Sequence, residues 1–282
     1  MLIDSHCHLD YIAAGKHGHP ADADLAVVLE RSRAYGVVAW INPGVTLAEL
    51  GRVQALAEAH ANVFYAASIH PCDVDTTHGH PHWLAEIETY LAHPKAVAVG
   101  ETGLDYYYHP PNSPEASTQR TCFEQLLTLA QKHDLPLIIH DREAHDDIAA
   151  MVGNFKGVRG VMHCYSGDAA FADTMMALGF VISFAGNVTF KKATMLQEAA
   201  QHVPLSHLLV ETDAPYLSPM PERGRPNEPY RTRFVAEFIA QLKGITVDEL
   251  AEATTANTVR LFGLPQALAV SQPLPPLPAS VA

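Results

Sequence analysis

The 282-residue sequence contains no apolar run of about 18 residues, the length that a membrane-spanning helix needs. Its beginning, MLIDSHCHLD, lacks the basic stretch and apolar core of a secretory signal. The four cysteines are scattered and form no Cys-x-x-Cys pair, so we expect no disulfide framework. These absences together predict a cytoplasmic protein without a membrane segment.

Positive charge is also scarce. The chain has 18 Lys and Arg against 31 Asp and Glu, a formal net charge of −13. Because the electrostatic field of a chain with this negative net charge does not attract nucleic acid, any phosphate binding must come from a local group of residues. Histidine, in contrast, is abundant, with 17 residues. Imidazole is the commonest transition-metal ligand, so this count favours a metal site.

Short apolar runs alternate with helical patterns through most of the chain, and neither internal repeats nor a glycine-rich phosphate fingerprint interrupts them. Such short runs, bounded by Gly, Pro or polar residues, are typical of buried parallel strands. The predicted strands are 2–8, 37–41, 63–69, 97–101, 137–140, 161–164, 180–184 and 208–211. The predicted helices are 25–35, 47–60, 83–92, 118–133, 169–178 and 194–202, with a weaker pattern at 146–151.

Eight strand and helix units predict an α/β fold, a single (β/α)₈ barrel of the TIM type. A doubly wound open sheet is the alternative, and the missing glycine-rich fingerprint argues against it. Two further helices are expected at 230–243 and 247–262. We therefore divide the chain into a barrel at 1–264 and a Pro-rich tail at 265–282, which we expect to lack regular structure and to be dispensable for chemistry.

The strongest chemical signal is His6-x-His8 in the first predicted strand. Residues two apart in a strand point to the same face, so both imidazoles are expected to face the barrel interior and Cys7 to face away as a core thiol. Taken alone, a His-x-His pair is weak evidence for a metal site.

Other ligand-type residues recur where predicted strands end, at the mouth of the expected barrel. They are Glu101, His140, His163 and Asp213. Each of them alone could be a hydrogen-bonded core residue, but burying all of them at one mouth is costly without a partner. Four histidines and two carboxylates can hold two divalent ions, with one carboxylate bridging them, and activate water for phosphoryl transfer.

Several motifs at these places resemble the TatD family of metal-dependent deoxyribonucleases, a branch of the amidohydrolase superfamily. They are IDSHCHLD (3–10), SIHP (68–71), GETGLD (100–105), HDREA (140–144), HCYSG (163–167), ETDAPYLSP (211–219), RPNEP (225–229) and NTVRLF (257–262). The resemblance runs from about residue 2 to residue 264. It implies divalent-metal ligation by His6, His8, Glu101, His140, His163 and Asp213, and a metal-dependent, often Mg²⁺-dependent, DNA exonuclease activity. The loop at 13–24 and the tail depart from the family pattern.

Further residues are weaker candidates. His70 is expected to contact a substrate phosphate or a metal-bound water, and the alternative is a mouth histidine bonded to a neighbouring carboxylate. Arg142 is expected to bind substrate phosphate, and the alternative is a structural salt bridge. Glu211 is a candidate for orienting a metal-bound histidine. A basic set could accept a nucleic-acid backbone, and the tyrosines at 106–108 could stack a base, although solvated charge and rim packing are the common explanations of such clusters. The basic set comprises Lys191, Lys192, Arg223, Arg225, Arg231 and Arg233.

The sequence thus predicts a phosphodiesterase acting on DNA, with two divalent ions (Mg, Mn or Zn) per chain. Asp213 is expected to ligate metal and accept a proton from the attacking water, and Glu101 to bridge the ions. One alternative is a superfamily hydrolase of an amide, lactone or aminoacyl ester, some of which carry a modified lysine where this chain has Glu101. Another is a binding scaffold without activity. No membrane partner is expected, and a monomer is the default oligomeric state.

Overall fold

The computed structural model describes residues 1–21, 23–77 and 80–278. The chain divides into two compact units, which we describe separately. Unit 1 comprises residues 1–41 and 183–282, and unit 2 comprises residues 42–182. No helix among the described residues is both long and apolar enough to cross a membrane.

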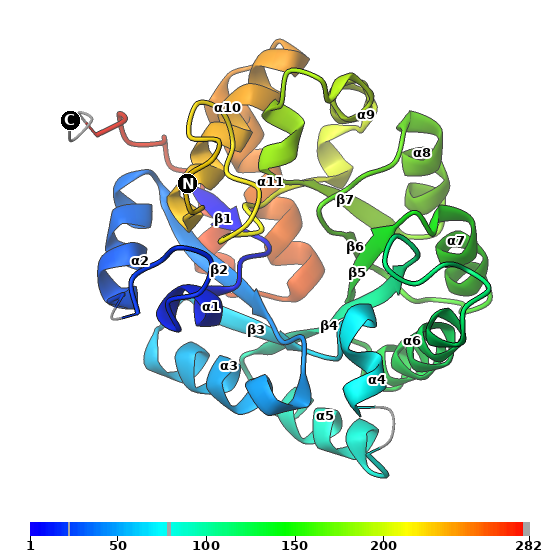
Figure 1. The fold of residues 1–282 in the computed structure, drawn as a ribbon. Helices are drawn as coiled ribbons and strands as arrows, with labels where there is room; N and C mark the ends of the chain where they lie inside the picture. Colours follow the sequence, from blue (N-terminus) through cyan, green and yellow to red (C-terminus); the bar gives the residue numbers. More distant parts are fainter. Residues whose placement is uncertain (22, 78–79, 279–282) are drawn as a thin grey trace. The chain divides into compact units, whose positions relative to one another are not determined.

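The strands follow one another in the sheet in the order of the sequence, from β1 to β8 (Figure 1). A doubly wound sheet would instead reverse its order at a switch point, so the predicted (β/α)₈ barrel is confirmed and the open-sheet alternative is excluded. The strands are β1 (Leu2–Asp4), β2 (Val37–Pro43), β3 (Val63–Ala67), β4 (Ala96–Asp105), β5 (Leu137–Arg142), β6 (Gly160–Met162), β7 (Phe180–Phe184) and β8 (Leu208–Val210).

Helices alternate with these strands, as the periodicity predicts. They are α1 (Leu9–Ala13), α2 (Leu25–Ala34), α3 (Leu47–Ala59), α4 (Val74–Thr77), α5 (Trp83–Leu91), α6 (Pro114–His133), α7 (His145–Gly153), α8 (Ala169–Ala177), α9 (Thr194–His202), α10 (Thr232–Lys243) and α11 (Val247–Phe262). Short 3₁₀ turns are η1 (Pro71–Asp73), η2 (Gly186–Thr189), η3 (Leu205–His207), η4 (Pro229–Arg231) and η5 (Gln266–Ala269). The weak pattern at 146–151 is a helix, whereas α1 and α4 are too short for a periodic signal.

In unit 1, β1 pairs with β2 in parallel. The chain just after β1 also contacts β8, because the Ser5 amide donates to the Val210 carbonyl at 3.2 Å. The first and last strands of the sequence are therefore neighbours, as barrel closure requires. Fully buried residues such as Leu2, Trp40 and Leu209 make this region apolar.

In unit 2, β3 to β6 pair in parallel, and β6 pairs with the first three residues of β7. Strand β4 is the longest, and its register with β5 shifts between Gly100 and Thr102, around the cis Gly100–Glu101 peptide. A side chain at Gly100 would lie 2.5 Å from the Cβ of Ile138, so only glycine fits beside β5. The small residue thus lets two backbones approach next to Glu101.

The structure moves the end of every predicted strand except β7. Strand β1 ends at Asp4 rather than residue 8, so His6 and His8 lie beyond it and the same-face argument was wrong for them. The reason is that this segment makes single bonds instead of a ladder: the Cys7 amide donates to the Ile41 carbonyl and the His8 amide to the Ala214 carbonyl. Cys7 is buried, as predicted.

Two further corrections, at β3 and β4, concern His70 and Glu101. Strand β3 ends at Ala67, three residues before His70, and β4 extends beyond Glu101 to Asp105. The extension of β4 follows from tertiary pairing, since the GETGLD segment keeps bonding to β5 although its glycines give no strand signal.

The Pro-rich tail contains one 3₁₀ turn and is docked on unit 1 as far as the structure describes it. The terminal ammonium of Met1 donates to the Gln272 carbonyl at 2.8 Å, and the Leu274 amide donates to Asp248 at 2.8 Å. The division of the chain at residue 264 stays a prediction.

Candidate metal centre

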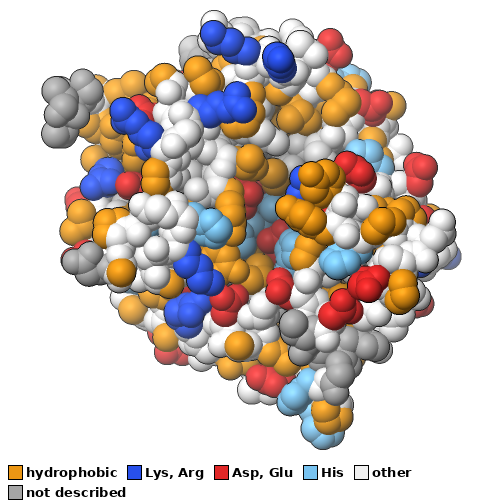
Figure 2. All heavy atoms as spheres, in the orientation of Figure 1, with side chains coloured by type: hydrophobic (Ala, Val, Ile, Leu, Met, Phe, Trp, Pro, Cys, Tyr) orange, Lys and Arg blue, Asp and Glu red, His pale blue; other side chains and the backbone are white. Residues whose placement is uncertain are grey.

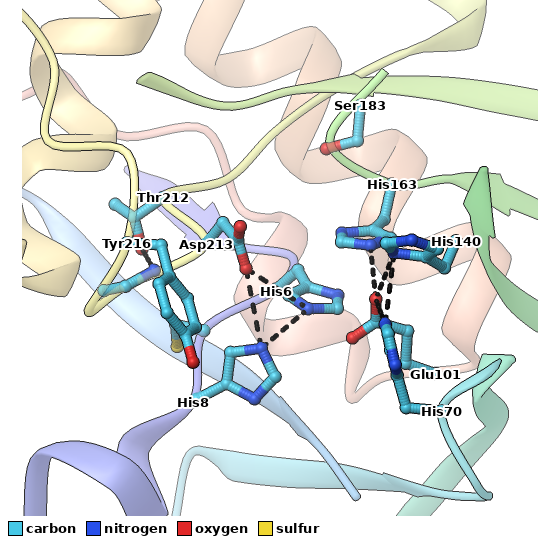
Figure 3. Close-up of polar contacts among 12 residues, drawn as sticks. His6, His8, His70, Glu101, His140, His163, Ser183, Thr212, Asp213 and Tyr216 are labelled. Atoms are coloured by element: carbon cyan, nitrogen blue, oxygen red, sulfur yellow. Dashed lines mark hydrogen bonds and ion pairs between the residues drawn. The ribbon is translucent and has the colours of Figure 1, made fainter. Parts of the chain in front are cut away.

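In unit 1, His6, His8 and Asp213 converge beyond the ends of β1 and β8. Their ligand atoms form a triangle in which His6 Nε2 lies 3.4 Å from His8 Nε2, and Asp213 Oδ1 lies 3.7 Å and 3.5 Å from these two atoms. Both imidazoles are buried, whereas the Asp213 side chain is 13% exposed. Figure 3 shows the three side chains pointing toward one another.

These distances fit a single first-row divalent cation. Ligand atoms held at 2.0–2.1 Å around a tetrahedral ion lie about 3.3 Å apart. The three observed separations, 3.4, 3.5 and 3.7 Å, are close to this value. Two imidazole nitrogens and a carboxylate oxygen are also a common donor set for Zn²⁺ and Mn²⁺. The residues therefore fit a bound metal ion.

Buried polar contacts hold this triangle in place. The Asp4 carboxylate accepts from the Thr212 hydroxyl at 2.6 Å and the Thr212 amide at 2.9 Å, which links β1 to the segment after β8. The Asp213 amide donates to the His6 carbonyl at 2.9 Å. Burial raises the pKa of Asp4 to about 7, although both Thr212 bonds act to lower it. The contacts fix the backbone of both ligand segments.

In unit 2, Glu101 converges with three histidines from other strand ends. Its Oε1 lies 2.7 Å from His163 Nε2, 2.9 Å from His140 Nδ1 and 3.4 Å from His70 Nε2. Glu101 and His163 are buried, and His70 and His140 are half-buried. Figure 3 shows Glu101 contacting these rings. One carboxylate oxygen surrounded by imidazole nitrogens is a second donor set suited to a divalent cation.

Hydrogen bonds at the far side of each ring assign the tautomers. His140 Nε2 lies 3.1 Å from Asp105 Oδ2, so we assign a proton to Nε2, and Nδ1, which contacts Glu101 Oε1 at 2.9 Å, is the nitrogen that a metal ion would take. His70 is opposite, because its Nδ1 accepts the Cys72 amide at 3.1 Å. Its Nε2 therefore carries the proton and lies 3.3 Å from His140 Nδ1. His140 is arranged as a ligand and His70 as a hydrogen-bond donor.

The charges of this group agree with that assignment for Glu101 and His70, whereas, despite its burial, the pKa of His140 is raised by hydrogen bonds to Asp105 and Glu101. Burial alone would raise the pKa of Glu101, but its electrostatic attraction to the neighbouring His163 and His70 and its hydrogen bonds with His140 and His163 outweigh this effect and lower that pKa well below its usual range. Burial lowers the pKa of His70, more than Glu101 raises it. Glu101 is consequently an ionised carboxylate and His70 a neutral imidazole near neutral pH.

Comparison with known proteins identifies the family. A family model described as "TatD related DNase" matches residues 3–263. The chain belongs to the TatD family. The curated metal-dependent hydrolase YcfH of Escherichia coli is 38% identical over 93% of this chain and 96% of its own length, and YabD of Bacillus subtilis is 38% identical over 93% and 99%. The crystal structure of the TatD homologue YJJV from E. coli matches with a TM-score of 0.84 at 31% identity, over 94% of this chain and 98% of its own.

Membership of the TatD family places the chain among metal-dependent hydrolases and confirms the resemblance found in its motifs. The six predicted ligands lie in the two groups just described, His6, His8 and Asp213 in unit 1 and the other three in unit 2. The bridging role of Glu101 stays a prediction. So does the orienting role of Glu211, which is buried.

Residues that the motif analysis missed support the ligands. Asp105 holds His140, and Asp4 with Thr212 holds the first triangle. The Asn227 side chain donates to the carbonyls of Thr212 and Tyr216 at 3.0 Å and 2.6 Å, which anchors the loop after β8. Both acids lie inside quoted motifs (IDSHCHLD and GETGLD), and that position was the signal available for them.

The candidate substrate contacts divide into exposed and buried residues. Arg142 is the last residue of β5, and its guanidinium lies 3.8 Å from the ring centroid of Tyr107 and 5.1 Å from that of Tyr108. Those two rings are 53% and 62% exposed. Tyr106 is buried and bonds to Asp147 instead, so a base-stacking role was wrong for it.

The predicted basic set is also split. Arg231 and Arg233 are buried and bind Ser218 and Glu237, respectively, so they cannot contact a nucleic-acid backbone. Their long side chains reach inward from the start of α10 and stabilise the loop and helix there. The exposed members are Lys191, Lys192, Arg223 and Arg225.

Proposed function

We propose that this TatD-family protein is a metal-dependent hydrolase that cleaves phosphodiester bonds in DNA, using one divalent cation at each of the two donor groups. The observation that carries the proposal is the triangle of His6, His8 and Asp213, whose donor separations of 3.4–3.7 Å match one cation. The family description, a TatD-related DNase, supports the choice of substrate.

When bound, the cations would activate water and offset the charge that develops on a transferring phosphoryl group. The chain's own residues do the rest. Asp213 is the member of its triangle with the most exposed side chain, so its carboxylate can accept a proton from a water molecule. His70, through Nε2–H, can donate a hydrogen bond to a phosphoryl oxygen.

The surroundings of the second group favour a nucleic acid over an amide or lactone. Arg142 and the exposed rings of Tyr107 and Tyr108 combine a guanidinium with flat aromatic surface. A guanidinium suits phosphate oxygens, and aromatic rings stack on bases of any sequence. A small uncharged ester or amide would use neither feature.

The test is a metal-exchange nuclease assay on end-labelled single-stranded DNA, double-stranded DNA and RNA. Protein treated with a chelator should be inactive, and Mg²⁺, Mn²⁺ or Zn²⁺ should restore a ladder of products on DNA. Asp213→Asn protein, treated identically, is the control for a contaminating nuclease. Undiminished cleavage by verified metal-free protein, or no cleavage of any nucleic acid with any metal, would contradict the proposal.

A further inference from the structure

A pocket of about 520 Å³ lies in unit 1, between the loop after α1, the segment after η2 and the loop after β8. Its lining includes apolar surface from Phe190, Pro215 and Leu217, while Arg223 and His17 add polar groups. The volume falls within the usual range of small-molecule sites, about 300–1,000 Å³. A mixed lining of this kind suits a ligand that has both a flat apolar part and a charged part.

One aromatic side chain connects this pocket to the first metal group. The Tyr216 ring packs edge-on against the metal ligand His8, with 5.9 Å between centroids, and its hydroxyl lies 2.9 Å from His17 Nε2. His17 in turn lines the pocket. Tyr216 therefore joins the wall of the pocket to the metal group within unit 1.

The charge at the pocket comes from Arg223. Arg225 is paired with Glu222 at 2.8 Å, and the buried Arg231 lies 3.6 Å from the same carboxylate. Among the residues that the structure describes, Arg223 has no carboxylate within ion-pair distance, and its guanidinium instead lies 4.2 Å from the centroid of Phe190. A stacked guanidinium keeps its N–H groups in the ring plane available for an anion.

The surface beside the pocket is also positively charged. Lys191 and Lys192 directly follow Phe190 and are exposed. In Figure 2 several Lys and Arg side chains lie on the part of the visible face where Figure 1 places α9 and α10, both in unit 1. In a chain of net charge −13 this is a local exception, and it is the kind of patch that phosphate binding requires.

We propose that this pocket binds one nucleotide unit of the substrate strand next to the scissile bond, with its phosphate on Arg223 and its base or sugar against Phe190 and Leu217. The proposal rests on the proposed function, because it supplies the neighbouring subsite of the same reaction. A free phosphate would leave the apolar part of the lining unused, and an apolar peptide would leave Arg223 unpaired.

The test measures binding without cleavage. A fluorescein-labelled single-stranded DNA tetranucleotide is titrated with protein in a chelator, and fluorescence anisotropy gives Kd at several salt concentrations. Arg223→Gln should bind at least 10-fold more weakly, and the slope of log affinity against log salt should fall by about 0.7, the value for one lost contact to a single strand. The matched control is Arg33→Gln, which also removes an arginine lying over an aromatic ring (Trp40, at 5.4 Å) but does not line the pocket.

The outcomes separate the two proposals. Equal affinity of Arg223→Gln and Arg33→Gln, or competition by tripolyphosphate as strong as that by an unlabelled tetranucleotide, would overturn the nucleotide subsite. If only Arg223→Gln loses affinity for the tetranucleotide, and the wild-type protein cleaves no nucleic acid with any metal, the nucleotide subsite is supported and the proposed phosphodiesterase activity is rejected. Because Arg223 is exposed, its substitution is expected to leave the fold intact, and unchanged thermal unfolding confirms that the effect is local.

Discussion

At the residue scale, hydrogen-bond partners rather than residue type divide the histidines into roles. His140 and His70 both lie beside Glu101, yet Asp105 fixes the proton of one ring and the Cys72 amide fixes the lone pair of the other. An imidazole that presents N–H cannot ligate a metal through that nitrogen. Two neighbouring histidines are therefore assigned different chemistry by contacts behind them.

The tautomer assignment predicts that His70→Asn keeps its metal but loses rate. Asparagine can still accept the Cys72 amide as the residue that precedes η1, so the local turn should persist. Turnover should fall by about 10²-fold, the scale for losing one preorganised donor. Metal content by mass spectrometry should equal that of the wild type, whereas His140→Asn, the matched control, should lose an ion. A lost ion in His70→Asn would make His70 a ligand.

Asp213→Asn separates proton transfer from metal binding. The amide keeps nearly the same volume and one ligating oxygen but is a poor proton acceptor. We expect at least one bound metal, because His6 and His8 remain, an unchanged fold, and a fall in single-turnover rate of about 10²-fold or more. Turnover, thermal unfolding and metal stoichiometry should be measured on one preparation. Wild-type turnover would remove Asp213 from the mechanism, and an unfolded variant would show a structural role.

At the element scale, helix α11 illustrates how local chemistry fixes an end. Its first turn carries a capping box, in which the Glu249 amide donates to the Thr246 hydroxyl at 3.2 Å and the Thr246 amide donates to Glu249 Oε2 at 2.8 Å. At the other end Gly263 adopts a left-handed conformation. Both signals are local in sequence, which is why the predicted range 247–262 agrees with the structure.

The capping box predicts a contribution to stability that depends on Thr246 and on pH. Thr246→Ala should lower the free energy of unfolding by about 1 kcal/mol at pH 7. Thr128→Ala, which changes an exposed threonine inside α6, should leave it unchanged.

The pH dependence comes from Glu249, because hydrogen bonds from the Thr246 amide and hydroxyl lower the pKa of its carboxyl group. Its contribution is therefore present above its unfolded pKa and is lost as pH falls through the folded value. Urea unfolding of the wild type and of Glu249→Ala from pH 7 to pH 3 measures this contribution. A difference in the free energy of unfolding that stays constant over this range would contradict the prediction.

At the scale of the whole molecule, the donor groups predict two metal ions per chain and a stability that depends on them. A ligand that binds only the folded state stabilises it by about 2.7 kcal/mol at 100 times its Kd. Chelation should therefore lower the Tm, and added Mn²⁺ or Zn²⁺ should restore it. His8→Ala and His163→Ala should each lose one ion, and a single ion in the wild type would contradict the two-site arrangement.

The sequence by itself determined the order of the strands, because each is a short apolar run bounded by turn residues and each is joined to the next by a helical pattern. It also determined which residues are chemically able to bind a metal, since histidines and acids among apolar runs are conspicuous. Sequential strands with intervening helices leave a barrel as the architecture that buries every run.

The tertiary structure alone decided how those residues meet. The strand ends differ from the predicted ones because pairing with β5 extends β4 through a glycine-containing segment, and single bonds to Ile41 and Ala214 carry the chain past β1. Asp105 contacts the candidate ligand His140 across 35 residues of sequence, and Asp4 contacts Thr212, the neighbour of the candidate ligand Asp213, across 208. No local pattern encodes such contacts, because they depend on which distant segments the fold brings together.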